Sequence, residues 1–502
     1  MAERQPVVTT ASLPSEQMVA PGQGFLPPWP ATLFLLSAVF PVFFYIGDFL
    51  LTPMRVMGVL AILIVPIRLF LAKAYGRITV VDFLIVFYAV WVMISYLHNH
   101  GTSQIVLGGL TVTNILGGYL VGRATIRTVA HMQAVARLLA TILIALLPFA
   151  IYESITADYV IPDIIKSISG LSSYSEVDIG RRLGLDRAQV VFVHPIHWGL
   201  FCSLPISLYM IGLANQVSLG RRVFVAVFVI ASGLTSLSSG PILATFVQVG
   251  LIAYALVFRA LRLQWPLFTW GFGVFYLIGE FLSDRFFFYA LASRVALNPG
   301  TAFYRTLIWD HGTAQVARTP LLGVASGYWE RPFWMTSSID NYWLQTAVSS
   351  GIPAAFAMVF AFLYTTVRIG KGTYVRGTDA YNMRVAVTIL MIGLFAALAT
   401  VTLWNEMLAV VMFLLGACAF MLQAQPVTET TEATSPPKSR RAHLSGDGTA
   451  EAPDRTRPTY TRFPAGVPTG DAGRSTRALQ ARPRDRTPVS GGRNWALRRD
   501  GP

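Results

Sequence analysis

Five arginines lie between residues 283 and 349, in a segment that joins two long apolar stretches. Four acidic residues accompany them. The arginine side chain presents a fixed fork of donors that matches phosphate oxygens, and it keeps its charge at physiological pH. This composition predicts a site for a phosphate-bearing ligand. The arginines are Arg285, Arg294, Arg305, Arg318 and Arg331, and the acids are Asp284, Asp310, Glu330 and Asp340.

Large aromatic side chains are interleaved with these charges. A sugar ring stacks its C–H face on an aromatic ring while its hydroxyls take hydrogen bonds, so this mixture is typical of glycan-binding clefts. A second interpretation is an aromatic belt at a membrane interface, with arginines reaching toward lipid headgroups. The belt is the better explanation for a single tryptophan, whereas the whole segment, with the stretch 320–327 between its charged ends, favours a site. The aromatic residues are Trp309, Tyr328, Trp329, Trp334, Tyr342 and Trp343.

A second group of arginines precedes another apolar stretch. Arg182 and Arg187 belong to the segment 181-RRLGLDRAQVVFVHPIHWG-199 and offer anion contacts from a second direction. His194 and His197 follow, but no acidic or cysteine ligand lies at a spacing that would complete a metal site, so we expect no metal. The sequence also contains no phosphate-binding glycine loop, nucleophile elbow or zinc-protease motif, and we expect no cofactor.

Long apolar stretches are the elements that would position these residues. A helix of about 20 apolar residues crosses a hydrocarbon core of about 30 Å. Hydrophobic residues make up 54% of the chain and charged ones 13%, and the mean hydropathy is +0.54, which is far from a soluble domain. We therefore predict an all-α polytopic membrane protein with about 12 transmembrane helices. The predicted spans are 31–51, 54–72, 80–97, 104–121, 132–151, 197–214, 222–238, 241–258, 265–282, 350–367, 384–402 and 405–423.

The number of basic residues alternates from one connection between spans to the next. Lys and Arg gather in every second connection, whereas the short connections 98–103, 239–240 and 403–404 contain none. Lys and Arg of short loops remain on the cytoplasmic side. Both termini are therefore predicted to be cytoplasmic, at an inner membrane, and two large loops, about 152–196 and 283–349, to be periplasmic.

The chain divides into three predicted parts. Residues 1–29 form a polar N-terminal segment, residues 30–424 the transmembrane domain, and residues 425–502 a basic cytoplasmic tail. The tail is rich in Pro, Gly, Ser, Thr and Arg without apolar periodicity, so we expect it to be disordered. The formal charge of +14 comes mainly from the tail and the cytoplasmic loops, and it does not indicate nucleic-acid binding. Cys202 and Cys418 fall inside spans, which argues against a disulfide framework.

Ionisable residues are scarce near the centres of the predicted spans. Asp48, Glu153, Glu280 and Glu406 all lie at predicted outer ends. An ion-coupled transporter usually places carboxylates or broken helices near the membrane centre. The polar groups of this chain gather instead at the outer face, which favours chemistry on the headgroup of a membrane-embedded substrate.

Three short motifs stand out: Arg305-x3-Trp309 followed by Pro320-x2-Gly323, the segment Asp340-Asn341-Tyr342-x-Leu344 leading to Gly351, and the turn 236-SLSSGP-241. Together with the span pattern, these motifs resemble the O-antigen ligase/polymerase-like superfamily of bacterial envelope polysaccharide proteins, over about residues 30–424. Two positions depart from the pattern of its ligases: Asp340 stands where those commonly have histidine, and Ser239 where they often have arginine. Both departures argue against a ligase, and the His-Pro-Ile segment at 194–196 and the pair Asp340-Asn341 look more like members that polymerise exopolysaccharide or capsule repeats.

The resemblance implies a metal-independent glycosyltransferase at the periplasmic face of a bacterial inner membrane. Its donor would be an undecaprenyl-diphosphate-linked oligosaccharide, whose repeat units it would polymerise into an exopolysaccharide, capsule or O-antigen. Membrane lipid, a chain-length regulator and an export complex are the other expected partners. An O-antigen ligase acting on lipid A-core is the alternative reaction, and a flippase or a non-catalytic scaffold of the export machinery is the alternative class.

Residue roles follow from that chemistry. The departing lipid diphosphate gains negative charge, which preorganised guanidinium groups stabilise. Arg305 is the first candidate for this role, and Asp340 is the expected proton acceptor for the attacking hydroxyl. The alternative for Asp340 is an N-cap of the following helix. Further candidates are Arg182, Arg187 and Arg318 for the diphosphate, and Trp309, Tyr328, Trp329, Asn341 and Gln345 for the glycan.

Overall fold

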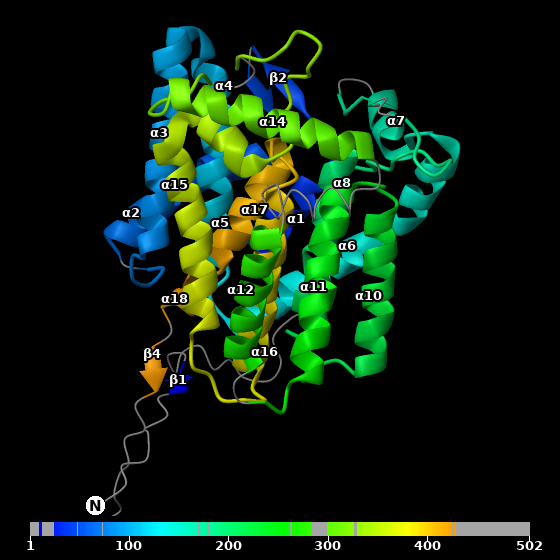
Figure 1. Ribbon diagram of the computed structural model, residues 1–502, viewed down its shortest axis with the longest axis vertical. Helices are drawn as coiled ribbons and strands as arrows, with labels where there is room; N and C mark the ends of the chain where they lie inside the picture. The colour runs from blue at the N-terminus through cyan, green and yellow to red at the C-terminus, as the bar shows by residue number, and fades with distance from the viewer. Residues whose placement is uncertain are drawn as a thin grey trace, which may run out of the picture. The chain divides into compact units, whose positions relative to one another are not determined.

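The computed structural model describes residues 10–12, 25–47, 49–72, 74–168, 171–175, 177, 180–261, 264–282, 299–325, 329–423 and 425–427. Within these ranges the chain is mostly helical (Figure 1). The strands in them form two short antiparallel pairs, β1 (Thr10–Ser12) with β4 (Gln425–Val427) and β2 (Phe44–Ile46) with β3 (Phe49–Leu51).

Helices occupy the places of the predicted spans and also parts of the predicted loops. In chain order they are α1 (Trp29–Ala38), α2 (Pro53–Phe70), α3 (Val80–His100), α4 (Ile105–Val112), α5 (Gly118–Thr125), α6 (Val129–Thr156), α7 (Val160–Ser167), α8 (Pro195–Ser203), α9 (Pro205–Met210), α10 (Leu219–Leu234), α11 (Ser239–Val257), α12 (Gln264–Leu282), α14 (Pro299–Arg318), α15 (Tyr342–Gly370), α16 (Asp379–Leu398), α17 (Asn405–Ala417) and α18 (Ala419–Leu422). A 3₁₀ turn (Gly101–Gln104) precedes α4, and a π-helical turn (Thr113–Gly117) joins α4 to α5.

Six helical stretches of the described ranges are long and apolar enough to cross a membrane, which indicates a membrane-embedded helical protein. The first, Val80–Thr125, holds two predicted spans, because the chain folds back at Gly101 (φ +61°) and brings Gly108 against Tyr96. The other predicted spans fall on helices outside this group: 54–72 on α2, 222–238 on α10 and 265–282 on α12, whereas 197–214 falls on the two short helices α8 and α9 and 31–51 only begins as a helix. The six stretches are Val80–Thr125, Val129–Thr156, Ser239–Val257, Tyr342–Gly370, Asp379–Leu398 and Asn405–Leu422.

The predicted span 31–51 is wrong in its second half. Helix α1 ends at Ala38 after 10 residues, so at 1.5 Å per residue it is only about 15 Å long. Pro41 has no N–H to continue the helix, and the hairpin of β2 and β3 follows, with Gly47 at φ +59° in its turn.

The two predicted loops contain helices of their own. Helix α7 lies within 152–196, and α14 lies within 283–349. Helix α15 begins at Tyr342, eight residues before the predicted start at 350, because the Asn341 side chain caps it, and it bends at Gly351 (φ +83°). Residues 283–298, with Asp284, Arg285 and Arg294, lie outside the described ranges. So does most of the predicted tail.

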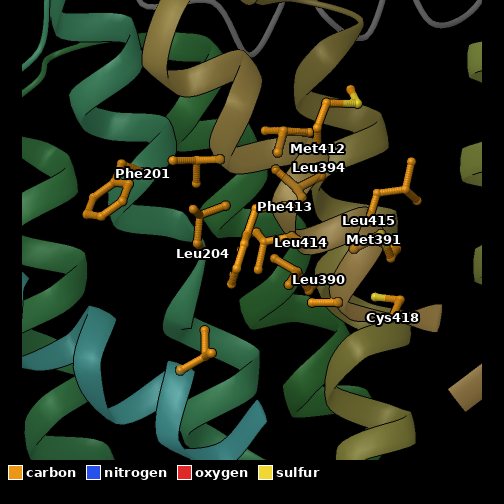
Figure 2. Packing of buried hydrophobic residues seen from close by; sticks show 14 of the residues in the cluster. Phe201, Leu204, Leu390, Met391, Leu394, Met412, Phe413, Leu414, Leu415 and Cys418 are labelled. Carbon is orange, nitrogen blue, oxygen red and sulfur yellow. The ribbon is translucent and has the colours of Figure 1, made fainter. Parts of the chain in front are cut away.

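Helix α17 is the centre of the hydrophobic core. Every residue of α17 from Glu406 to Ala417 is buried. Its side chains belong to one buried cluster with residues of α16 and of the α8–α9 segment, and Figure 2 shows Leu204, Leu394 and Phe413 of this cluster. A helix that is apolar on all sides belongs in a protein core or in a bilayer.

Small residues let α5 approach α17 closely. A Cβ atom on Gly122 would lie 2.0 Å from the Phe413 carbonyl oxygen, and one on Gly118 would lie 2.2 Å from that of Ala409. On α17, a Cβ atom on Gly416 would lie 2.0 Å from the Tyr119 carbonyl oxygen. Such glycine spacing allows backbone contact between helices in a bilayer, where packing replaces the hydrophobic effect as the force between helices.

Candidate functional site

The turn between α10 and α11 is the centre of the candidate site. We call residues 236–240 the serine turn. Its hydroxyls fold it locally, because Ser236 Oγ donates to the Gly233 carbonyl at 2.7 Å and Ser238 Oγ donates to the Ser236 carbonyl at 2.9 Å. Leu237 takes a positive φ of +46° to complete the reversal. Apart from the half-buried Ser239 the turn is buried, and it therefore offers carbonyl and hydroxyl oxygens shielded from bulk water.

Two arginines of the first long loop donate to the serine turn. Arg187 is buried; its Nη2 donates to Ser238 Oγ at 2.7 Å and its Nε to the Ser236 carbonyl at 3.4 Å. Arg182 donates from Nη1 to the Leu237 carbonyl at 2.8 Å. Both side chains therefore reach the same short stretch of backbone.

The end of α6 holds this loop in place. The buried Glu153 carboxylate accepts hydrogen bonds from the backbone N–H groups of Gln189, at 2.6 Å, and Val190, at 3.0 Å. The N–H of Ala188 donates to the Thr235 carbonyl at 3.1 Å, next to the serine turn. Arg187 lies between these anchor points and the turn, so Glu153 is a positioning residue for its guanidinium.

Arg305 approaches the serine turn from α14. Its Nη2 donates to Ser239 Oγ at 3.3 Å and to the Thr400 carbonyl at 3.4 Å. Helix α14 lies crosswise over the helix ends at the top of Figure 1 and packs on α15. The candidate site thus joins α14, the serine turn and the connection between α16 and α17.

The segment after α14 is docked on the bend of α15. The N–H groups of Val324 and Ala325 donate to the carbonyls of Val348 and Ser349 at 3.0 and 2.9 Å. Gly323 (φ +62°) and Gly351 (φ +83°) lie at this contact, where a Cβ on Gly351 would be 2.0 Å from the Leu321 carbonyl oxygen. The motif glycines therefore fix the far end of α14, the helix that carries Arg305.

Asp340 lies near Arg187 but does not cap α15. The cap is Asn341, whose Oδ1 accepts from the Leu344 N–H at 3.1 Å, so the N-cap interpretation of Asp340 is wrong. Asp340 is half-buried and accepts a hydrogen bond from Ser338 Oγ at 3.1 Å. The extended backbone of Asn341 makes Asn341 the better cap, and Asp340 keeps its carboxylate for other partners.

Arg182 and Arg187 place two positive charges in a partly buried position, and this lowers the pKa of both. Desolvation lowers the pKa of Arg187 to about 10; the neighbouring Arg182 acts in the same direction, and Asp340 acts in the opposite one. Burial also lowers the pKa of Arg182. In the part of the chain that the structure describes, neither arginine forms an ion pair with a carboxylate. A bound anion would relieve this repulsion and replace the lost hydration.

Other predicted residues lie away from this centre. Arg318 pairs with Glu330 on an exposed surface, so the structure does not bring it to the serine turn. Trp329 is only 4% exposed and donates from Nε1 to the Ser337 carbonyl, within the small core of Ile308 and its neighbours, so its faces are not open to a sugar. Tyr328 lies outside the described ranges.

The three remaining candidates for glycan binding differ in their exposure and in their hydrogen bonds. Trp309 lies on α14 one turn after Arg305 and is 38% exposed. Asn341 uses its side-chain oxygen as the helix cap. Gln345 lies in the first turn of α15, and its Oε1 is buried without a hydrogen-bond partner among the described residues.

The prediction missed most of the oxygens that hold the arginines. The serine turn was noticed only as a motif of small residues, and Glu153 only as an acid at a span end. The Thr400 carbonyl has no sequence signal at all, because any residue type supplies a backbone carbonyl.

The arrangement suits binding of a multiply charged anion. Three guanidinium groups meet around one turn, and the charge of the Asp340 carboxylate raises the pKa of one of them, Arg187. Among the described residues no group of three His, Cys, Asp or Glu side chains is placed to hold a metal ion. His194 turns its Nδ1 to the Ile196 N–H at 3.1 Å and caps α8. A scan against protein-family models finds no match to this chain, and a search among curated proteins finds none either.

Proposed function

We propose that this protein is a glycosyltransferase of the periplasmic face of a bacterial inner membrane. It would polymerise undecaprenyl-diphosphate-linked oligosaccharide repeat units into an exopolysaccharide, capsule or O-antigen. The observation that carries this proposal is the meeting of Arg182, Arg187 and Arg305 at the serine turn, close to helices that are long enough to cross a membrane. A lipid diphosphate is the substrate class that needs both features.

The proposed mechanism assigns the arginines to the leaving group. The acceptor hydroxyl oxygen forms a bond to the anomeric carbon, and the bond from that carbon to the diphosphate oxygen breaks. The electron pair of the broken bond goes to the diphosphate, whose added charge Arg187 and Arg305 stabilise. Asp340 orients the acceptor sugar by accepting a hydrogen bond from the attacking hydroxyl, and it receives the proton of that hydroxyl as the new bond forms. The serine turn keeps the guanidinium groups in place before substrate binds, so little reorganisation accompanies the reaction.

The same geometry also suits a ligase that transfers finished polymer to lipid A-core, since its donor is also a lipid diphosphate. Asp340 favours the polymerase, because it stands where ligases of the resembling superfamily commonly have histidine. A flippase is disfavoured by α17, which is apolar and buried along nearly its whole length. A scaffold is disfavoured because it has no need for three arginines at one buried turn.

The lipid-linked glycan profile of a strain lacking this gene tests the proposal. Single repeat units that accumulate on the lipid carrier at the periplasmic face, with no long polymer, are the expected result. Long polymer left on its carrier would identify a ligase instead. Repeat units trapped at the cytoplasmic face would refute the transferase and favour a flippase.

Complementation by variants then separates an enzyme from a scaffold. Arg187→Gln and Arg305→Gln should be present in the membrane at normal levels but fail to restore polymer. Arg181→Gln is the matched control, since Arg181 lies in the same loop, is exposed and pairs with Asp186 rather than with the serine turn. Full polymer from both test variants would favour the scaffold.

A further inference from the structure

A tight hairpin turn from Arg182 to Leu185 presents two leucines beside the arginines of the candidate site. The N–H of Arg182 donates to the Leu185 carbonyl at 2.9 Å, and the N–H of Leu185 donates to the Arg182 carbonyl at 3.0 Å. The two central residues, Leu183 and Gly184, have φ values of +55° and +79°. Two central residues with positive φ are typical of a type I′ turn, which prefers Asn-Gly at these places.

This turn is anchored on the helix bundle on both sides. Before it, Arg182 Nη1 donates to the Leu237 carbonyl of the serine turn at 2.8 Å. After it, the N–H of Asp186 donates to the Ser154 carbonyl of α6 at 3.0 Å. The leucines are therefore held in a defined place next to the serine turn.

Leu183 has a backbone conformation that leucine rarely adopts. The left-handed region suits glycine and asparagine, whereas a bulky side chain at positive φ is an outlier. The Leu183 side chain is 84% exposed, and that of Leu185 is 40% exposed. An exposed leucine alone is ordinary on a protein surface. At this position, however, the leucine adds little to the core and also disfavours the turn, so stability of the fold does not account for it.

Positive φ values at non-glycine residues gather around the candidate site. Val190 and Leu237 bury their side chains, so packing compensates for the strain of their backbone. Leu183 has no such compensation. Strained backbone is characteristic of binding and active sites, where contacts with a ligand use it. In the described ranges the non-glycine residues with positive φ are Ala157, Leu183, Val190, Leu237, Ala325 and Asn405.

The chemistry of the turn matches the two parts of a lipid diphosphate. Arg182 offers a guanidinium for the diphosphate, and Leu183 offers an apolar side chain. The two residues are consecutive, so their Cα atoms are about 3.8 Å apart. In a lipid-linked donor the first isoprene unit is bonded directly to the diphosphate. An arginine that meets the diphosphate therefore brings the neighbouring leucine to the beginning of the isoprenoid chain.

We propose that Leu183 contacts the first isoprene units of the lipid-linked donor while Arg182 contacts its diphosphate. The inference rests on the proposed function and adds to it the residue that recognises the lipid part of the donor. Leu185, on the other side of the turn, extends the apolar contact. The contact removes apolar surface of the leucine and of the isoprenoid chain from water, and it therefore favours a lipid-linked diphosphate over a free one.

Leu183→Asn is the test variant, because asparagine is similar in size and suits the left-handed turn but is polar. Binding of undecaprenyl diphosphate and of inorganic diphosphate is measured on the full chain, both in detergent and in lipid nanodiscs. We expect the affinity for undecaprenyl diphosphate to fall by about tenfold in both media, as for loss of one buried leucine contact. The affinity for inorganic diphosphate should stay the same, and the melting temperature should not fall.

Three further variants separate the side chain from the backbone. Leu183→Met keeps an apolar side chain and should keep the affinity for undecaprenyl diphosphate. Leu183→Gly removes both the strain and the side chain, so it should bind as weakly as Leu183→Asn. Ile164→Gln is the matched control, since Ile164 lies on α7 in the same long loop and is 57% exposed. It should leave both affinities unchanged.

Three results would overturn the inference. An unchanged affinity for undecaprenyl diphosphate in Leu183→Asn and Leu183→Gly would mean that Leu183 does not meet the donor. Equal weakening for both ligands would mean that the turn only positions Arg182. Weakening in nanodiscs but not in detergent would mean that Leu183 contacts the lipid bilayer instead.

Failure of the proposed function gives a different pattern. An unaltered protein that binds undecaprenyl diphosphate but transfers no glycan would refute the transferase and leave the lipid contact standing. An unaltered protein that does not bind undecaprenyl diphosphate would refute both.

Discussion

Arg187 donates to the hydroxyl of Ser238 at 2.7 Å, across 51 residues of sequence. Neither Arg187 nor Arg182 is paired with a carboxylate in the described part of the chain, and neutral oxygens hold both. An incoming anion therefore does not have to break an ion pair before it binds. The site is charged and ordered in advance, which is the condition for stabilising charge that develops during a reaction.

Loss of Arg187 should weaken diphosphate binding. Hydrogen bonds to charged groups contribute about 1.5–3 kcal/mol, so Arg187→Gln should weaken binding of undecaprenyl diphosphate by about tenfold or more. Arg187→Lys should fall between Gln and the unaltered protein, since lysine keeps the charge but loses the fork. Binding to protein in nanodiscs by microscale thermophoresis measures both. Arg181→Gln is the control, and equal weakening by this variant would mean that only the net charge of the loop matters.

Diphosphate binding should also depend on pH at the alkaline end. Burial lowers the pKa of Arg187 to about 10, so its charge is complete at neutral pH and is lost as the pH rises through about 10. We expect an affinity that is constant between about pH 7 and 9 and falls above that. The same titration on Arg187→Gln should lack this step. A step of the same size in that variant would assign the titration to another group.

Neutralising Asp340 should shift that step to lower pH. The Asp340 carboxylate raises the pKa of Arg187, so Asp340→Asn removes this support and the arginine loses its proton earlier. Glycan transfer by this variant should also fall by about tenfold or more, since the acceptor sugar loses an orienting carboxylate. Asp310→Asn, on the exposed face of α14, serves as the control. An unshifted alkaline step in Asp340→Asn would contradict the proposed proximity.

The bend of α15 should not accept a side chain. Gly351→Ala places a Cβ at φ +83° and 2.0 Å from the Leu321 carbonyl oxygen, so we expect a loss of more than about 2 kcal/mol in the free energy of unfolding. Gly370→Ala is the matched control in the same helix, where the nearest atom would be 3.5 Å away. Thermal unfolding in detergent compares the two. Equal melting temperatures would mean that the bend relaxes without cost.

The sequence predicts the helices well where they are continuously apolar. Helices α6 and α16 lie where the spans were expected, because length and apolar composition are local properties. The hairpin after α1 was not predicted, since the apolar residues on both sides of Pro41 outweighed that single helix-breaking residue. Helix α14 was not predicted, because its charged and aromatic residues are also typical of a loop.

The candidate site was predictable in its charges but not in its contacts. Arg182, Arg187 and Arg305 were chosen by residue type, and the structure brings all three to one turn. Arg318 and Trp329 have the same residue types, yet one pairs with Glu330 and the other is buried in a small core. Which arginine meets which oxygen depends on long-range packing, and no local pattern encodes it.

The burial of α17 has a consequence for biosynthesis. A nascent chain emerges from the ribosome with its N-terminus first. Helix α17 therefore reaches the bilayer after α1, α2, α5 and every other helix that the structure describes, except the short α18. Until then the glycine face of α5 has no partner and must be covered by lipid or by an insertion factor. Translation stalled before residue 405 would therefore leave a bundle without its central helix and with this glycine face uncovered by protein.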